Sequence, residues 1–186
     1  YLMRTNTSSY IDLENLIKFC DSNNNELLYR GRKITNSFNK RTISYVSGAE
    51  ILLSKKVFKL LIKNKKMWDI NFVDDVSIGA SLQNHNILIE ESESIQFNNQ
   101  FFKLKKFNHE YHFRCRVDSP FYYPRYLEKF LFKYIHKELR NNKISFFKRQ
   151  AYNFFFQINR VFAFKKHYDF VTYYVFKYLK KLIKNI

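Results

Sequence analysis

The order of hydrophobic and polar residues predicts short helices that alternate with short strands. Apolar residues recur at helical spacing in three segments, 9–20, 55–64 and 125–140. Short apolar or alternating stretches predict strands at 26–33, 87–89 and 111–117, and residues 44–49 predict a strand that runs into a tight turn. Polar residues predict loops at 36–40 and 90–99. This alternation of strands and helices favours an α/β fold.

Two helix starts can be placed on single residues. Ser54 stands directly before the periodic segment 55–64, where a serine hydroxyl can cap the first backbone N–H groups. A further helix is predicted to begin at Asp74 and Asp75, because negative charge is favourable at a helix N-terminus. This helix is predicted to end at the polar residues 84–86.

The charge is distributed unevenly along the 186 residues. Residues 1–102 hold 13 Lys+Arg and 11 Asp+Glu, a balance of +2, whereas residues 103–186 hold 20 and 5, a balance of +15; together they make the net charge of +17. Because 46% of the residues are hydrophobic, the chain can bury a core, which excludes a wholly disordered protein. The sequence therefore predicts a globular part followed by a basic part that binds an anionic partner, either nucleic acid or a membrane surface.

The basic part is also aromatic. Residues 144–186 are predicted to be helical, with an apolar stripe formed by Phe170, Tyr173, Tyr174, Tyr178 and Leu182. Such a segment suits binding to an anionic membrane surface. It equally suits an ordinary helical cap on the domain with its lysines in water, and the sequence leaves both interpretations open.

Cysteine use and hydropathy bear on the compartment. Cys20 and Cys115 are too few for a disulfide scaffold, which favours a reducing compartment. No stretch approaches 18 apolar residues, the length that indicates a membrane-spanning helix. We therefore expect a cytoplasmic protein that can associate peripherally with a membrane.

Two short motifs could carry chemistry. Asp74 and Asp75 are adjacent carboxylates at a helix start, suited to a general base, a sugar hydroxyl or a metal ion. The alternative is structural, an acidic N-cap followed by an acidic first residue. Ser47, Gly48 and Ala49 follow a predicted strand and form a turn that a ligand could approach closely, or a plain turn.

A third motif lies on the predicted strand 111–117. His112, Arg114 and Arg116 alternate there, so their side chains are expected on one face. A histidine beside two arginines suits an anion or a metal–diphosphate. The alternative is a solvated basic face of the strand.

In combination these motifs resemble a known family. Tyr45–Ser54 contains Ser-Gly-Ala followed by an aliphatic strand that ends in Ser, and Asp-Asp-Val-x-x-Gly follows one helix later at 74–79. This order is similar to the C-terminal half of GT-A-fold glycosyltransferases of the β-1,3-galactosyltransferase and Fringe type. The segment Arg4–Ser9 also resembles related bacterial and viral sequences, and the resemblance covers about residues 1–118. It implies the C-terminal part of a GT-A (Rossmann-like, mixed-sheet) glycosyltransferase domain over 1–120, followed by basic helices over 121–186.

The resemblance also implies roles for individual residues. Asp75 matches the proposed catalytic base, and Asp74 matches the preceding acidic residue that contacts the acceptor or orients the site. His112 matches a late histidine that binds a divalent metal, commonly Mn²⁺, which acts on the leaving diphosphate. The remaining positions are expected to bind substrate: Ser47, Gly48, Ala49, Gly79, Arg114 and Arg116. The implied reaction is an inverting transfer of a hexose from a nucleotide-sugar donor to a glycan or lipid-linked acceptor.

One feature of the family is missing. Its Asp-x-Asp metal motif lies upstream of these segments, and the chain contains no Asp-x-Asp. We therefore expect an N-terminally truncated piece that is inactive by itself, or a non-catalytic relic. Two other functions stay open: a nucleic-acid-binding protein of ribosomal type from an AT-rich genome, suggested by the +15 half, and a non-catalytic membrane-binding module.

Overall fold

A computed structural model describes residues 1–38, 41–92, 95–96, 111–116 and 125–141, and, further along, 145, 147–148, 150–152 and 154–155. The chain divides into two compact units. The first contains Tyr1–Phe97 and Phe107–Arg116, and the second contains Asn98–Lys106 and Val117–Ile186. The first unit is mixed α/β, which confirms the fold class expected from the alternation of strands and helices.

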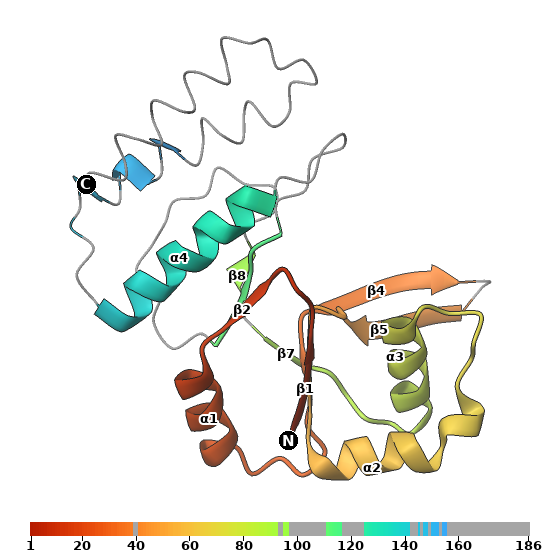
Figure 1. Cartoon of the computed structure of the whole chain (residues 1–186). Coiled ribbons are helices and arrows are strands. Elements are labelled where there is room, and N and C mark those ends of the chain that lie inside the picture. Colours follow the sequence, from red (N-terminus) through yellow and green to blue (C-terminus); the bar gives the residue numbers. More distant parts are fainter. Residues whose placement is uncertain are drawn as a thin grey trace, which may run out of the picture. The chain divides into compact units, whose positions relative to one another are not determined.

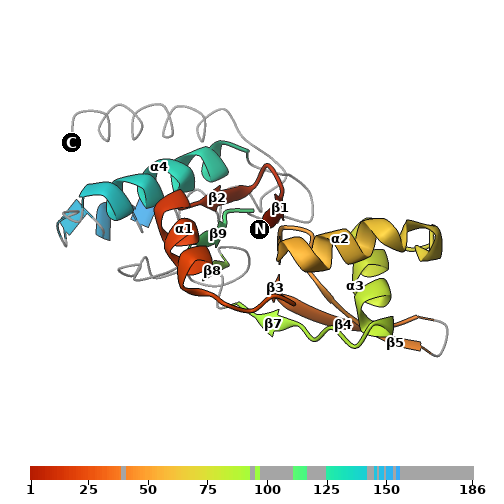
Figure 2. The same cartoon turned by 90° about the horizontal axis from the view of Figure 1, so that it is seen from below.

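The first unit contains a mixed four-stranded sheet. Its strands, in spatial order, are β1 (Leu2–Thr5), β6 (Glu50–Leu53), β3 (Tyr29–Gly31) and β7 (Glu90–Glu91). β6 runs antiparallel to both β1 and β3, whereas β7 runs parallel to β3, and Figure 2 shows β3 and β7 side by side. All four residues of β6 are buried, as expected for an aliphatic central strand.

Two smaller sheets complete this unit. β2 (Ser9–Ile11), β9 (His112–Arg114) and β8 (Ile95–Gln96) form one, with β9 in the middle. In its register Ser9 pairs with Arg114 and Ile11 pairs with His112. The other is the hairpin of β4 (Lys33–Phe38) and β5 (Arg41–Val46).

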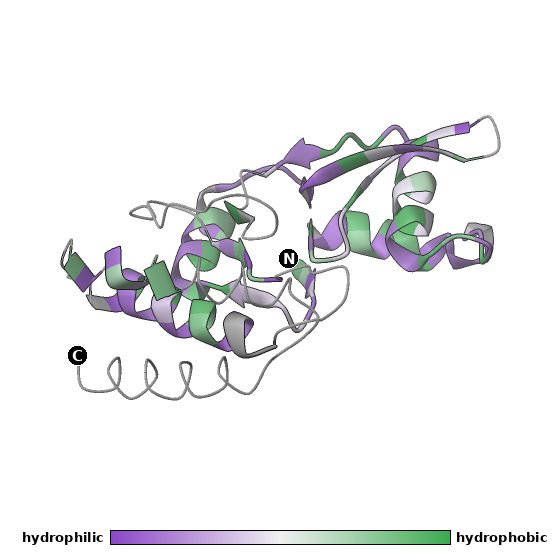
Figure 3. Ribbon diagram, turned by 90° about the horizontal axis from the view of Figure 1, so that it is seen from above, coloured by the Kyte–Doolittle hydropathy of each residue, from purple (hydrophilic) through white to green (hydrophobic). Residues whose placement is uncertain are grey.

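Helices lie beside the strands of this unit (Figure 1). They are α1 (Leu13–Ser22), α2 (Lys55–Lys63) and α3 (Asp74–Asn84), and the 3-10 turn η1 (Lys65–Met67) follows α2. Ser54 caps α2 as predicted, because its hydroxyl accepts a hydrogen bond from the Val57 N–H. The main core joins α2 and α3 to the large sheet through buried side chains that include Tyr29, Ile51, Leu53, Val57, Leu61, Ile78 and Leu82. In Figure 3 hydrophobic residues alternate with hydrophilic ones along the helices, as expected for elements with one face on a core.

Four predicted elements differ from the structure. The loop expected at 90–99 contains two short strands, β7 and β8. The helix expected over 9–20 begins only after Asp12, whose side chain caps it, because Ser9–Ile11 pair with β9 instead. The loop expected at 36–40 overlaps strand β4, where polar side chains bond across the hairpin: Asn36 Nδ2 donates to Tyr45 Oη at 3.0 Å. The strand expected at 87–89 is irregular, and pairing with β3 begins only at Glu90.

The described part of the second unit is helical. α4 spans Arg125–Asn141, which confirms the helix predicted over 125–140. Leu131, Tyr134 and Ile135 of this helix are buried. The predicted stripe from Phe170 to Leu182 lies outside the described residues. Within the part of the chain that the structure describes, no helix is both long and apolar enough to span a membrane.

Candidate functional site

Polar side chains form two clusters around the turn at Ser47–Ala49. The carboxylate cluster consists of Arg4, Gly48, Asp74 and Asp75. The histidine cluster consists of Ser9, Glu50, Ser92 and His112. The turn belongs to both, because its Gly48 amide contacts the first cluster and its Ala49 carbonyl contacts the second.

The two adjacent aspartates lie in the first turn of α3. The N-cap of this helix is Val73, whose side chain makes no cap hydrogen bond, and Asp74 and Asp75 are the first two helical residues. The interpretation of Asp74 as an acidic N-cap is therefore wrong. Both carboxylates instead lie where the helix dipole favours negative charge.

Asp75 is held by the turn. The Gly48 N–H donates to Asp75 Oδ2 at 2.9 Å, and the Val76 N–H donates to Oδ1 at 3.0 Å. A Cβ at position 48 would lie 2.4 Å from Arg4 Nη1 and 3.2 Å from Asp75 Oδ2. Glycine is therefore needed here for the close approach of the Arg4 and Asp75 side chains to the backbone. Asp75 is half-buried, so its carboxylate is fixed without being sealed from solvent.

Asp74 has a different partner. Arg4, on strand β1 opposite Ile51, donates from Nη2 to Asp74 Oδ2 at 2.5 Å. The two side chains are 39% and 62% exposed, so water screens the pair and its contribution to stability is small. The effect of the pair is on geometry: the Arg4 guanidinium holds one carboxylate while the backbone holds the other.

The structure confirms the predicted turn at Ser47–Ala49, which follows strand β5. The Ser47 N–H donates to the Arg32 carbonyl oxygen, and the Glu50 N–H donates to the Ser47 carbonyl oxygen; both distances are 2.9 Å. The Ala49 carbonyl accepts from the hydroxyls of Thr5 and Ser9, at 3.0 and 3.3 Å. These bonds fix the direction in which the Gly48 amide points.

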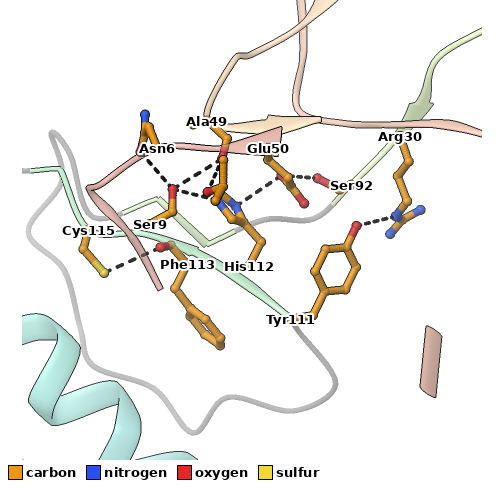
Figure 4. Close-up of polar contacts among 11 residues, drawn as sticks. Asn6, Ser9, Arg30, Ala49, Glu50, Ser92, Tyr111, His112, Phe113 and Cys115 are labelled. Carbon is orange, nitrogen blue, oxygen red and sulfur yellow. Dashed lines mark hydrogen bonds and ion pairs between the residues drawn. The ribbon is translucent and has the colours of Figure 1, made fainter. Parts of the chain in front are cut away.

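Figure 4 shows the contacts of the histidine cluster, in which Glu50, Ser92 and His112 are buried and Ser9 is half-buried. His112 Nε2 and Ser9 Oγ share a hydrogen bond of 3.0 Å, and His112 Nδ1 lies 3.3 Å from Glu50 Oε2. Glu50 Oε2 also accepts from the Ser92 hydroxyl at 2.7 Å. His112 and Glu50 are each 1% exposed. The cluster links β6 of the large sheet to β2 and β9 of the small one.

A buried phenol lies beside Glu50. Burial raises the pKa of Tyr111 above its usual range, and the negative charge of Glu50 raises it further. Arg30 opposes this effect, because its Nε donates to Tyr111 Oη at 3.2 Å. Arg30 in turn forms an ion pair with Glu90 at 2.6 Å.

The other predicted substrate-binding residues are dispersed. A Cβ at Gly79 would lie 2.3 Å from Tyr45 Cβ and 2.8 Å from Tyr45 Cα, so this glycine lets α3 pack closely on β5. The ladder register and strand alternation put Arg114 on the same face as His112, half-buried and opposite Ser9. Arg116 lies beyond the end of β9 and is exposed.

The surroundings of His112 bear on the Mn²⁺ expectation. Both ring nitrogens face protein groups, Ser9 and Glu50, at 3.0 and 3.3 Å. Within the described ranges no three His, Cys, Asp or Glu residues gather in a way that could hold a metal ion. The described residues around His112 therefore do not fit a metal, and Mn²⁺ binding stays a prediction.

Four residues of these clusters have no role predicted from the sequence: Arg4, Ser9, Glu50 and Ser92. The partners of Arg4, Ser9 and Ser92 are far along the chain, so no local pattern indicates them. Glu50 carried a signal of its own, because it is a charged residue at the start of an aliphatic strand. A carboxylate in such a position must find a polar partner when the strand is buried.

Comparisons with protein-family models, curated proteins and solved structures gave no match. The glycosyltransferase resemblance rests on the motifs at 47–54 and 74–79.

Proposed function

We propose that this chain forms the acceptor side of a GT-A-type glycosyltransferase. The reaction is an inverting transfer of a hexose from a nucleotide sugar to a glycan or lipid-linked acceptor. The observation that carries this function is the division of the two aspartates. Asp75 is held by the Gly48 amide at 2.9 Å, whereas Asp74 is bound to Arg4.

Adjacent carboxylates with different environments can take different roles. The Arg4 guanidinium lies on Asp74 and offsets its charge locally. Asp75 is bonded only to backbone N–H groups among its described hydrogen bonds, and it is half-buried. Asp75 is therefore the better general base, and Asp74 with Arg4 orients it or the acceptor.

The chemistry assigned to Asp75 is one proton transfer. Its carboxylate takes the proton of an acceptor hydroxyl while that oxygen forms a bond to the anomeric carbon. The bond from the anomeric carbon to the diphosphate oxygen breaks on the opposite face, and the nucleoside diphosphate leaves with the electron pair. A positioned base contributes about 10²–10⁴-fold to such a step.

The test is made on the complete product of the gene, with a panel of nucleotide sugars and release of nucleoside diphosphate as readout. Asp75→Asn should lower kcat by about 10²-fold or more, because the amide cannot accept the proton. Asp74→Asn should have a smaller effect, mainly on KM. Asp21→Asn, at an exposed position on α1, is the control and should leave the rate unchanged.

Two results would contradict the proposal in different ways. Full activity of the Asp75→Asn variant would show that another group is the base. Release of nucleoside diphosphate from no donor in the panel by the unsubstituted protein would overturn the transferase function itself.

A further inference from the structure

α4 presents a row of cations to solvent. Lys129, Lys133 and Lys137 follow one another at four-residue spacing, which places them along one side of the helix, and all three are exposed. His136 and Arg140 are exposed as well. Every residue of α4 described as exposed is therefore Lys, His or Arg.

The acidic residues of α4 are buried. Glu128 and Glu138 are only 3% and 4% exposed. The side chains that α4 presents to solvent are therefore the basic ones. The exposed side of α4 is consequently basic along most of its length.

Two large apolar side chains are exposed shortly after α4. Phe147 and Phe154 are 82% and 66% exposed, in helical residues seven positions apart, a spacing that returns to the same side of a helix. The residues between and beside them pack differently: the Tyr152 ring lies 5.3 Å from the Tyr134 ring, and the Phe155 ring lies 5.0 Å from the Phe130 ring. This segment therefore packs on α4 through one pair of aromatic rings and exposes the other.

We propose that the exposed side of α4, together with Phe147 and Phe154, binds the surface of an anionic lipid bilayer. Lysines and arginines near such a surface are attracted by its negative potential. Exposed phenylalanines gain by burial at the boundary between headgroups and acyl chains. Duplex nucleic acid offers the same negative charge but no apolar phase for the two rings, so the exposed phenylalanines favour a membrane over a duplex. Single-stranded RNA, whose bases can stack on aromatic rings, is the alternative that the RNA-binding measurement tests.

The chain contains its own matched control. Lys55, Lys59 and Lys63 on α2 have the same four-residue spacing and are also exposed. They belong to the part of the chain with a balance of only +2, whereas α4 belongs to the part with +15. Removing three charges from α2 changes the net charge by the same amount as removing three from α4.

The experiment is sedimentation of the full chain with vesicles of phosphatidylcholine containing about 30 mol% phosphatidylserine, at ~0.1 M salt. Each lysine near the surface contributes about fivefold to partitioning, the equivalent of about 1 kcal/mol. Replacement of Lys129, Lys133 and Lys137 by Gln should therefore weaken binding about 100-fold. The corresponding α2 triple variant should bind within about threefold of the original chain, because electrostatic attraction falls off within a Debye length.

Further variants separate charge, apolar contact and folding. Replacement of the same three α4 lysines by Arg keeps the charge and should keep the binding. The double variant Phe147→Ser and Phe154→Ser should weaken binding to the anionic vesicles while the three lysines remain. Circular dichroism checks that each variant keeps its helix content.

Three results would overturn the proposed membrane binding. The first is no sedimentation of the original chain with the anionic vesicles, and the second is an equal loss of binding in the two lysine triple variants. The third is tight RNA binding that the α4 triple variant abolishes, together with no vesicle binding by the original chain. None of these measurements requires transferase activity. Failure here therefore leaves the proposed reaction untouched, and failure of the transferase assay leaves the vesicle result standing.

Discussion

The carboxylate cluster and the histidine cluster share one turn but meet solvent in opposite ways. The ion pair of the first, Arg4–Asp74, has side chains 39% and 62% exposed. The pair of the second, His112–Glu50, is 1% exposed on both sides. A screened pair contributes little to stability and is accessible to a ligand, whereas a buried pair is inaccessible and its disruption is costly. The comparison predicts that stability depends on the buried cluster and activity on the exposed one.

The largest effect on stability is expected from His112→Ala. This substitution leaves the Glu50 carboxylate buried without its histidine partner, a kind of loss that costs about 3–5 kcal/mol. Urea unfolding at neutral pH measures the change. His85→Ala, at an exposed position after α3, is the control and should stay within about 0.5 kcal/mol of the original chain. A cost below that of ordinary surface substitutions at His112 would show that the buried cluster is not what holds the two sheets together.

Gly79→Ala is expected to have the next largest effect. The added Cβ would lie 2.8 Å from Tyr45 Cα and 2.9 Å from the Ser44 carbonyl oxygen, and backbone atoms cannot move aside cheaply. Overpacking of this kind costs about 1–3 kcal/mol. Thermal unfolding of Gly79→Ala beside Ala80→Gly separates the clash from the change in helix propensity. An unchanged midpoint for Gly79→Ala would mean that α3 can shift away from β5.

Gly48→Ala should lower activity strongly but stability only slightly. Its Cβ would meet the Arg4 guanidinium at 2.4 Å, and that group is the mobile end of a long side chain. We expect a loss of stability of about 1 kcal/mol or less, because such a contact relieves itself by rotation of the side chain. The Arg4–Asp74 pair is then displaced, and transferase activity should fall more than in the less stable Gly79→Ala variant. Equal activity of the two variants would contradict a role for the turn in the reaction.

The parts of the fold that the sequence predicts correctly depend on neighbouring residues. Ser54 and the helix after it, the turn at Ser47–Ala49 and helix α4 are set by caps, turns and periodicity within a few residues. The strand at Ser9–Ile11 was missed because its pairing partner, β9, lies about a hundred residues along the chain. Its apolar residues continue the periodicity of the following helix, so the local pattern alone could not show where the helix begins.

The candidate site can likewise be predicted only where its residues belong to short local motifs. Asp74, Asp75 and Gly48 belong to short motifs, and the structure brings them together. Arg4 was not predictable as their partner, because an arginine on an edge strand has many acids within reach and only the register of β1 on β6 selects Asp74. For His112 the motif indicated a basic face, but the ring is buried beside Glu50, a contact between strands that no local pattern encodes.

The smallest effect on stability is expected from Arg4→Gln, which removes one member of the exposed pair with Asp74. Breaking an exposed ion pair costs about 0.2–1 kcal/mol, and less at high salt. Lys56→Gln breaks the pair between Lys56 of α2 and Glu26, whose side chains are 63% and 76% exposed, and should also have little effect on stability. The two variants should differ only in activity, because loss of Arg4 removes the guanidinium that fixes the Asp74 carboxylate beside Asp75. The kcat/KM of the Arg4→Gln variant should therefore fall below that of Lys56→Gln, measured by release of nucleoside diphosphate. Equal kcat/KM values would mean that Arg4 contributes only to packing around Gly48, and that Asp75 is positioned by the Gly48 amide alone.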